Sequence, residues 1–145
     1  MPDTTYVIVD LPEFLSLQHL FLRMNFSGQR AIKAHTAVPV KLERNAFNLL
    51  PVQLLPDAKL SGDSFISHFG LSKTTDFTQK LVIANRFFDC CGLYLTGQYS
   101  RSDDITAWRP HDLLYQAVCD QYHEVKALDF HIAGNYELIA SSRPR

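Results

Sequence analysis

The sequence predicts an α+β fold: a single domain with a mixed or antiparallel central sheet, about three main helices and a C-terminal β-hairpin. Residues 75–141 follow the patterns of helix, strand, helix and hairpin in that order. The chain has 145 residues, near the commonest domain size, and 46% of them are apolar. That apolar content offsets the entropy lost on ordering the chain. We therefore expect residues 1–145 to share one core, with 141–145 as a loose tail.

The first expected elements are a strand at residues 6–9 and a helix over about residues 12–25. The strand is a short β-branched run, and Asp10 and Pro12 after it are typical of a helix start. The helix has one apolar face, and further apolar side chains widen it. Because so much of its surface is apolar, we expect the helix to be mostly buried.

The next elements are expected to be strands. Val38, Val40 and Leu42 alternate with polar residues, and Pro39 places that strand near an edge or a bulge. Residues 47–55 are predicted to form a second strand, although Pro51 and Pro56 make this segment a less typical strand. Residues 65–69 fit a short helix or a strand, and we favour the strand.

The C-terminal half predicts a helix from Thr75 to Cys91, a strand over residues 93–98 and a second helix opening at Pro110. Gly92 follows the first helix and suits a C-terminal cap. Two alternating runs then flank Gly134-Asn135, which predicts a tight hairpin turn at that dipeptide.

Composition and charge favour a protein of a reducing, cytoplasmic compartment. The three cysteines are an odd number and two of them are adjacent, which does not make a disulfide framework. No apolar run reaches the length that crosses a membrane. The net charge is −1, without the basic excess that a nucleic-acid binder usually shows. We expect no membrane and no nucleic-acid partner.

The spacing of cysteine and histidine residues does not favour a metal site or a reactive cysteine. Cys119 and His123 lie four apart on an expected helix, but no second half-site completes a zinc ligand set, so we predict no metal. Cys90 falls at the end of an expected helix, where the dipole raises a thiol pKa, so a nucleophilic role is disfavoured.

Aromatic and arginine side chains gather around the polar loop of residues 98–109. Loops on a rigid scaffold often carry binding function, and aromatic and Arg residues are typical anchors of protein interfaces. We predict a partner-binding surface made of Tyr99, Arg101, Trp108 and Arg109. The alternative is that Trp108 only covers the core beneath a long loop.

The order of the expected elements, together with Leu114-Tyr115 in the last helix and residues 122–125 before the hairpin, resembles the GNAT family of N-acetyltransferases. The resemblance spans nearly the whole chain and implies an enzyme that uses acetyl-coenzyme A. In that reading Tyr115 is the general acid and His68 the base. The coenzyme pyrophosphate would bind near Lys73, Thr74 and Thr75. The glycines of the family's pyrophosphate loop are absent from residues 73–78, and Asp76 would repel the phosphates.

Two hypotheses follow. The first is a non-catalytic inhibitor or accessory protein, of the kind carried by a virus or mobile element, that binds a protein partner and needs no cofactor. The alternative is a divergent GNAT-like acyltransferase that takes acetyl-coenzyme A. The first fits the lack of a catalytic signature better. Self-association through exposed strands is compatible with both.

Overall fold

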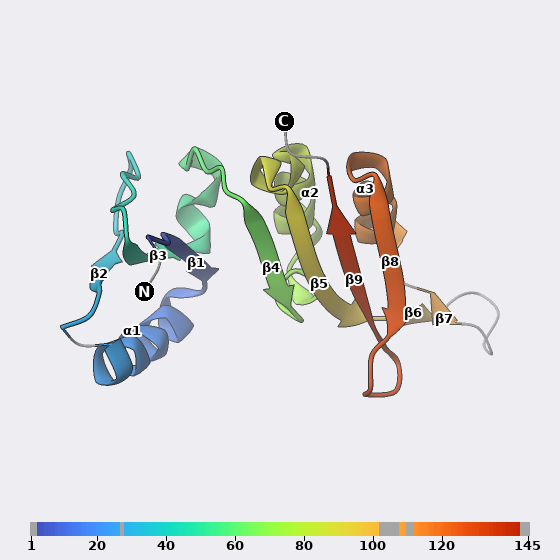
Figure 1. The fold of residues 1–145 in the computed structure, drawn as a ribbon, viewed down its shortest axis with the longest axis horizontal. Coiled ribbons are helices and arrows are strands. Elements are labelled where there is room, and N and C mark those ends of the chain that lie inside the picture. Colours follow the sequence, from blue (N-terminus) through green and yellow to red (C-terminus); the bar gives the residue numbers. More distant parts are fainter. Residues whose placement is uncertain (1–2, 27, 102–107, 110–111, 143–145) are drawn as a thin grey trace. The chain divides into compact units, whose positions relative to one another are not determined.

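The computed structural model describes residues 3–26, 28–101, 108–109 and 112–142. The chain forms two compact units, residues 1–59 (unit 1) and residues 60–145 (unit 2). Both mix helices and strands (Figure 1), which confirms the mixed α/β class. The strands are shared between a sheet in unit 1, a sheet in unit 2 and a short two-stranded ribbon. The single domain that the sequence suggests stays a prediction.

Unit 1 is a parallel three-stranded sheet with one helix packed against it. Its elements are β1 (Tyr6–Asp10), α1 (Pro12–Phe26), β2 (Ala31–Ala34) and β3 (Ala46–Pro51), and the strand order is β1-β3-β2. The central strand β3 is the apolar one and is almost wholly buried. Leu15 and Leu22 of α1 pack with Phe47 and Leu49 of β3 to form the core. The predicted first strand and first helix are thus confirmed.

Helix α1 is not mostly buried, so that prediction is wrong. Only Leu15 and Leu22 among its residues are buried. Phe14, which was expected on the buried face, lies exposed. The apolar residues expected to widen that face are exposed as well: Leu17, Leu20, Phe21 and Met24. The physical reason is that the small sheet of unit 1 covers one side of the helix, whereas the apolar residues extend over more than half of its circumference.

The strand predicted at residues 38–42 is absent, and that prediction is wrong. The strand lies earlier, at β2, and the segment after it is held by a buried Asn48. The Asn48 side chain accepts a hydrogen bond from Glu43 N at 2.9 Å, donates to Glu43 O at 2.9 Å and meets the His35 ring at 3.0 Å. These bonds satisfy the loop backbone without a sheet partner. Beyond β3, Pro51 ends the strand and a 3₁₀ helix follows over Val52–Asp57.

Unit 2 is built on a four-stranded mixed sheet. Its main elements are β4 (Ser64–His68), α2 (Asp76–Ala84), β5 (Gly92–Gln98), β6 (Ser100–Arg101), β7 (Trp108–Arg109), α3 (Asp112–Gln121), β8 (Glu124–Asp129) and β9 (Asn135–Ser141). The sheet order is β4-β5-β9-β8, with β4 parallel to β5 and β9 antiparallel to both of its neighbours. The strand favoured for residues 65–69 is confirmed.

The two faces of this sheet differ. Register pairs Leu93 with Ala140 and Leu95 with Leu138, and these four side chains are buried on the face that α2 and α3 cover. The next row, Ile66, Tyr94 and Ile139, points to the opposite face because side chains alternate along a strand. Ile66 is 72% exposed and Ile139 43% exposed. We call this opposite side the open face of the sheet.

Helix α2 ends at Ala84, so the predicted continuation to Cys91 is wrong. The next residues, Arg86–Asp89, all have positive φ, between 48° and 59°. Left-handed backbone costs a non-glycine residue about 1–2 kcal/mol. Burial of Phe87 offsets this conformational free-energy cost. Its ring lies 5.5 Å from the Phe65 ring and 6.1 Å from the Tyr122 ring.

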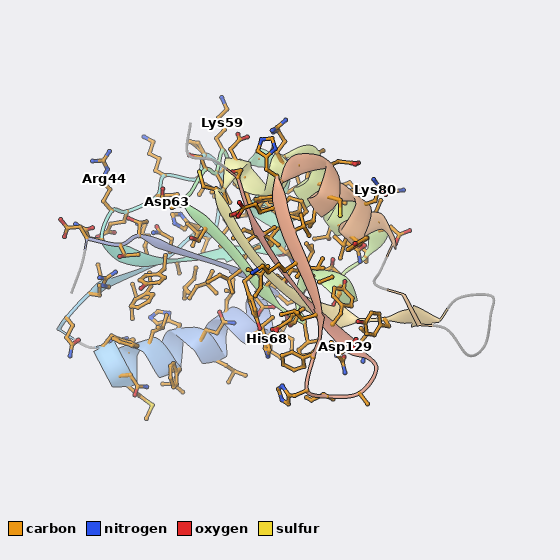
Figure 2. All side chains as sticks on the ribbon, turned by 45° about the vertical axis from the view of Figure 1, so that its right-hand side comes forward. Arg44, Lys59, Asp63, His68, Lys80 and Asp129 are labelled. Atoms are coloured by element: carbon orange, nitrogen blue, oxygen red, sulfur yellow. The ribbon has the colours of Figure 1, made fainter. Side chains whose placement is uncertain are left out.

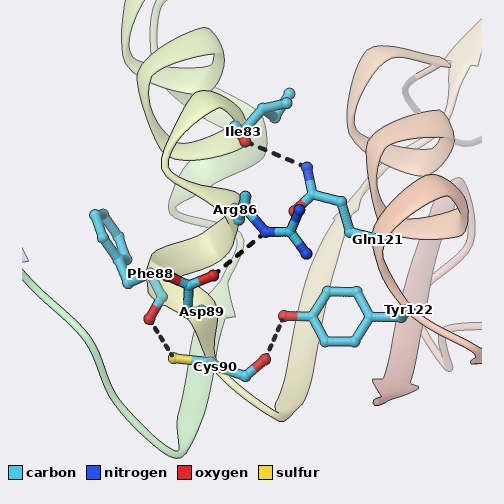
Figure 3. Close-up of polar contacts among 7 residues, drawn as sticks. All are labelled: Ile83, Arg86, Phe88, Asp89, Cys90, Gln121 and Tyr122. Carbon is cyan, nitrogen blue, oxygen red and sulfur yellow. Dashed lines mark hydrogen bonds and ion pairs between the residues drawn. The ribbon is translucent and has the colours of Figure 1, made fainter. Parts of the chain in front are cut away.

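Polar contacts hold this left-handed turn to α3 (Figure 3). Tyr122 donates its hydroxyl hydrogen to Cys90 O at 3.1 Å, and Gln121 Nε2 donates to Ile83 O at 3.2 Å. Arg86 and Asp89 form an ion pair of 3.3 Å on the surface of the turn. The two helices on the covered face are therefore tied together at the end of the sheet where β5 begins.

The C-terminal hairpin is confirmed, but its turn is not the predicted dipeptide. Strands β8 and β9 are joined by residues 130–134, and Asn135 already belongs to β9. Phe130 N donates to Asn135 O at 3.0 Å and closes the loop. Gly134 has φ +77°, the left-handed conformation that glycine adopts without strain. In the part of the chain that the structure describes, no helix has the length and apolar character to cross a membrane.

We predict that Gly97→Ala destabilises unit 2 by about 1–3 kcal/mol because a buried site cannot accept the added methyl group. A Cβ at Gly97 would lie 2.7 Å from the Tyr136 hydroxyl oxygen and 3.0 Å from Ser72 Cβ, and Tyr136 is fully buried. Gly92→Ala in the same strand is the control, since its Cβ would meet nothing closer than 3.6 Å. Urea unfolding measures both, and equal stabilities of the two variants would contradict the prediction.

Candidate functional site

Aromatic side chains cluster at the end of the unit 2 sheet where β4 and β5 finish. We call this cluster the aromatic end and define it as His68, Phe69, Tyr99, Phe130 and His131. His68 closes β4, Tyr99 follows β5, and Phe130 and His131 open the β8–β9 loop. Figure 2 shows His68 and Asp129 at this same end of the sheet.

Three rings of the aromatic end, those of His68, Phe69 and Phe130, contact one another edge to face. Phe69 lies 4.8 Å from His68 and 5.5 Å from Phe130, and His68 lies 5.9 Å from Phe130. Such arrangements are favourable for aromatic pairs. The Lys73 ammonium sits 5.5 Å above the Phe69 ring, within cation–π range. His68 also meets the Thr96 hydroxyl at 3.0 Å, which fixes its ring on the sheet.

Tyr99 and Asp129 form the polar part of the site. The Tyr99 hydroxyl donates a 2.5 Å hydrogen bond to Asp129 Oδ1. Partial burial and this bond to the carboxylate raise the pKa of Tyr99 to about 12. Beside the pair lies an open hollow of about 390 Å³, lined by Tyr99, Asp129, Phe130, Ala133, Gly134 and Asn135. The hollow is open to solvent and presents the Asp129 carboxylate next to the rings of Tyr99 and Phe130.

The other residues predicted to bind a partner follow Tyr99 in the chain, on the ribbon β6–β7. The ribbon β6–β7 starts directly after Tyr99 and pairs Arg101 with Trp108 and Ser100 with Arg109. The backbone thus brings Arg101, Trp108 and Arg109 together on one short ribbon, which lies beside β8 in Figure 1. The side chains of these three residues, and residues 102–107, lie outside the described part of the chain.

The residues named for acyl transfer do not converge. His68 points to the open face, where its ring meets Thr96, whereas Tyr115 is on α3, which packs on the covered face. The pKa of Tyr115 is raised, first by the neighbouring Cys119, which also bonds to it, and then by burial. Strands β4 and β5 pair continuously from Ser64–Gly92 to His68–Thr96, so they do not splay apart there.

The residues named for coenzyme binding make contacts with their own neighbours in the chain. Thr75 caps α2 by accepting a hydrogen bond from Thr78 N at 3.4 Å. Thr74 donates to Leu71 O at 2.8 Å. Lys73 leans over Phe69, as described above. Asp76 opens the helix with a negative charge, which disfavours an anion at that end.

The cysteines are thiols with different surroundings. Cys90 is buried, and burial, Asp63, Cys91 and Asp89 raise its pKa, which disfavours a reactive thiolate. The predicted direction is therefore supported, although the cause is burial and not a helix end. Cys119 is exposed. Among the described residues, no group of three or more metal-ligating side chains lies close enough to hold an ion.

Sequence reasoning missed Asp129 and Phe69 and treated Phe130 as a strand residue. The only signal for Asp129 is its position five residues before Gly134, and this signal can be interpreted only when the length of the hairpin loop is known.

A search with the sequence finds no matching protein-family model and no matching curated protein.

We predict that Asp129→Asn lowers the pKa of Tyr99 from about 12 toward its ordinary value of 10.0, because the negative charge that disfavours the phenolate is gone. Burial keeps the pKa above that value. In the unchanged protein the contact stabilises the fold below about pH 10 and its contribution is lost as the pH rises toward 12. Titration of the Tyr99 ring by NMR measures the shift.

Tyr122 serves as the internal control for that titration. Its pKa is also raised to about 12, by burial first, and it does not contact Asp129. An unchanged Tyr99 titration in the Asp129→Asn variant, or an equal shift at Tyr122, would contradict the assigned cause.

A second prediction concerns thiol labelling. At pH 8, a maleimide should modify Cys119 rapidly and Cys90 only after unfolding, because Cys90 is buried and its pKa is raised. Tandem mass spectrometry of tryptic peptides at timed intervals gives both rates, because fragment ions distinguish Cys90 from the adjacent Cys91. Labelling of Cys90 at the rate of Cys119 in the folded protein would show that the left-handed turn opens readily.

Proposed function

We propose that this chain is a non-catalytic binding protein, an inhibitor or accessory factor that acts by protein–protein contact through the aromatic end and the β6–β7 ribbon. The observation that carries the proposal is the register of the ribbon. It pairs Arg101 with Trp108 immediately after Tyr99, which lines the hollow. Large aromatic and Arg residues supply most of the energy in protein interfaces.

The chemistry of the site supports recognition more than catalysis. The rings of His68, Phe69 and Phe130 give a rigid apolar surface, and Tyr99 and Asp129 add a fixed donor and acceptor pair beside it. Rigid aromatic groups lose little conformational entropy on binding. The unpaired cysteines are compatible with work in a reducing cytoplasm, which we include in the proposal.

The proposal is tested with the only tryptophan of the chain, Trp108. A partner is captured from an extract of the cells that express the gene, purified, and titrated against the protein by isothermal calorimetry. We expect Trp108→Ala to weaken its binding by roughly 30-fold or more, the effect of losing a central anchor of about 2 kcal/mol. Trp108 fluorescence should change on mixing the unaltered proteins.

Lys80→Ala is the matched control, since Lys80 is exposed on α2 and belongs neither to the aromatic end nor to the ribbon. Its affinity should equal that of the unaltered protein. If Trp108→Ala and Arg109→Ala bind the captured partner with unchanged affinity, the proposed surface is wrong.

The alternative function is a divergent GNAT-like acyltransferase. Its support is the element order of unit 2: a strand, a helix, a strand, the short ribbon β6–β7, a helix and two strands. Apart from the ribbon, this is the order on which the resemblance to the GNAT family is based. The separation of His68 and Tyr115 on opposite sides of the sheet speaks against it. Thermal unfolding with millimolar acetyl-coenzyme A distinguishes the two. Binding at 100 times the dissociation constant would stabilise the fold by about 2.7 kcal/mol, whereas the binding protein should show no shift.

A further inference from the structure

Helix α1 has two apolar faces, and the core of unit 1 uses only one of them. Leu15 and Leu22, seven residues apart, face the sheet and are 6% exposed. The outer face consists of Phe14, Leu17, Leu20, Phe21 and Met24, whose exposed fractions range from 53% to 77%. We call these five residues the outer face of α1. Apolar side chains this large and contiguous mark an interaction surface when they lie exposed.

We propose that the outer face of α1 binds the same face of a second copy of this chain, as an antiparallel helix pair with two-fold symmetry. Phe14, Leu17, Phe21 and Met24 repeat at alternating spacings of three and four residues, the spacing of a helix-pairing seam. They are placed symmetrically about His19. A two-fold axis at that level therefore sets Phe14 opposite the second copy's Met24, and Leu17 opposite its Phe21.

The charges beside the outer face are self-complementary in this arrangement. Glu13 is in the first turn of α1 and Arg23 in the last. Both lie on the same side of the helix as Leu20, at one edge of the seam, and we call this side the Leu20 flank. Leu20 is seven residues after Glu13 and three before Arg23, and residues at these spacings share a side of a helix. In an antiparallel pair each flank meets the same flank of the other helix. Glu13 then lies within about 3 Å, measured along the axis, of the level of the second copy's Arg23. A parallel pair would instead set each flank against the opposite flank of the other helix, so Glu13 and Arg23 would not meet.

The surface available is sufficient for a specific dimer of modest affinity. Five apolar side chains that are more than half exposed offer roughly 600 Å² per copy, or about 1,200 Å² for the pair, the lower end of the range for specific complexes. A membrane surface is a poorer occupant. Helices that lie on membranes carry several Lys or Arg on the polar face, and α1 has a single arginine balanced by Glu13.

The test is sedimentation equilibrium of the full chain over a wide concentration range. We expect a reversible dimer that Leu17→Lys shifts to monomer, with at least a tenfold rise in the dissociation constant, because the charge would be buried in the seam. Gln116→Lys is the control, since Gln116 is exposed on α3 and does not belong to α1. It should leave the dimer intact. Circular dichroism and thermal unfolding verify that both variants keep the fold.

Charge exchange tests the antiparallel order. Glu13→Arg alone and Arg23→Glu alone should each weaken self-association several-fold, because each produces two like-charge contacts in the symmetric pair. A mixture of the two variants should form a heterodimer, since position 13 of each copy then meets the opposite charge at position 23 of the other. The double variant Glu13→Arg/Arg23→Glu should dimerise like the unaltered chain.

Three results would overturn the proposal. One is a monomer at every concentration. The second is a dimer that Leu17→Lys does not weaken, since the interface would then lie elsewhere. The third is a monomer that binds vesicles of phosphatidylcholine and phosphatidylserine and loses that binding in the Leu17→Lys variant, which would assign the outer face of α1 to a membrane surface.

Discussion

The pairing of β5 with β9 is the constraint on which the rest of unit 2 depends. It joins seven consecutive residue pairs between segments distant in sequence, and it buries Leu93, Leu95, Leu138 and Ala140 on one face. Because β9 enters between β5 and β8, the hairpin loop is carried to the place where β5 ends. Gly97 and Tyr136 meet there, and only a residue without a side chain permits that approach.

The aromatic end is a consequence of this pairing. Tyr99 follows β5 and Asp129 ends β8, and their hydrogen bond exists because β9 holds β5 and β8 one strand apart. The same geometry places Phe130 against Phe69 and His68. The site is assembled from three separate segments that the sheet holds together. Contacts between segments restrict each ring, and restricted groups lose less entropy on binding. The open hollow and the adjoining ribbon extend that surface.

The two units use their apolar residues differently. Unit 2 covers one sheet face with two helices. Gln121 of α3 bonds to Ile83 in α2, and Tyr122 bonds to Cys90 after the turn that follows α2. The left-handed residues of that turn are tolerated because Phe87 is buried among other rings. Unit 1 has one helix for one small sheet, and therefore leaves much of the helix's apolar surface in contact with solvent. The distribution of core-forming partners, not the hydrophobicity of the segments, decides which apolar residues are available for binding.

The sequence by itself determined the mixed α/β class, the three helices, the strands at β1, β4 and β5 and the C-terminal hairpin, because local periodicity and capping residues report the neighbours of each residue along the chain. It also marked Tyr99. Tertiary structure alone decided that α1 is half exposed, that α2 stops at Ala84, and that Asn48 replaces a strand at residues 38–42. It alone also placed His68 and Tyr115 on different faces of the sheet. Each of these depends on contacts between segments distant in sequence, whose energies override local preference and leave no local pattern to interpret.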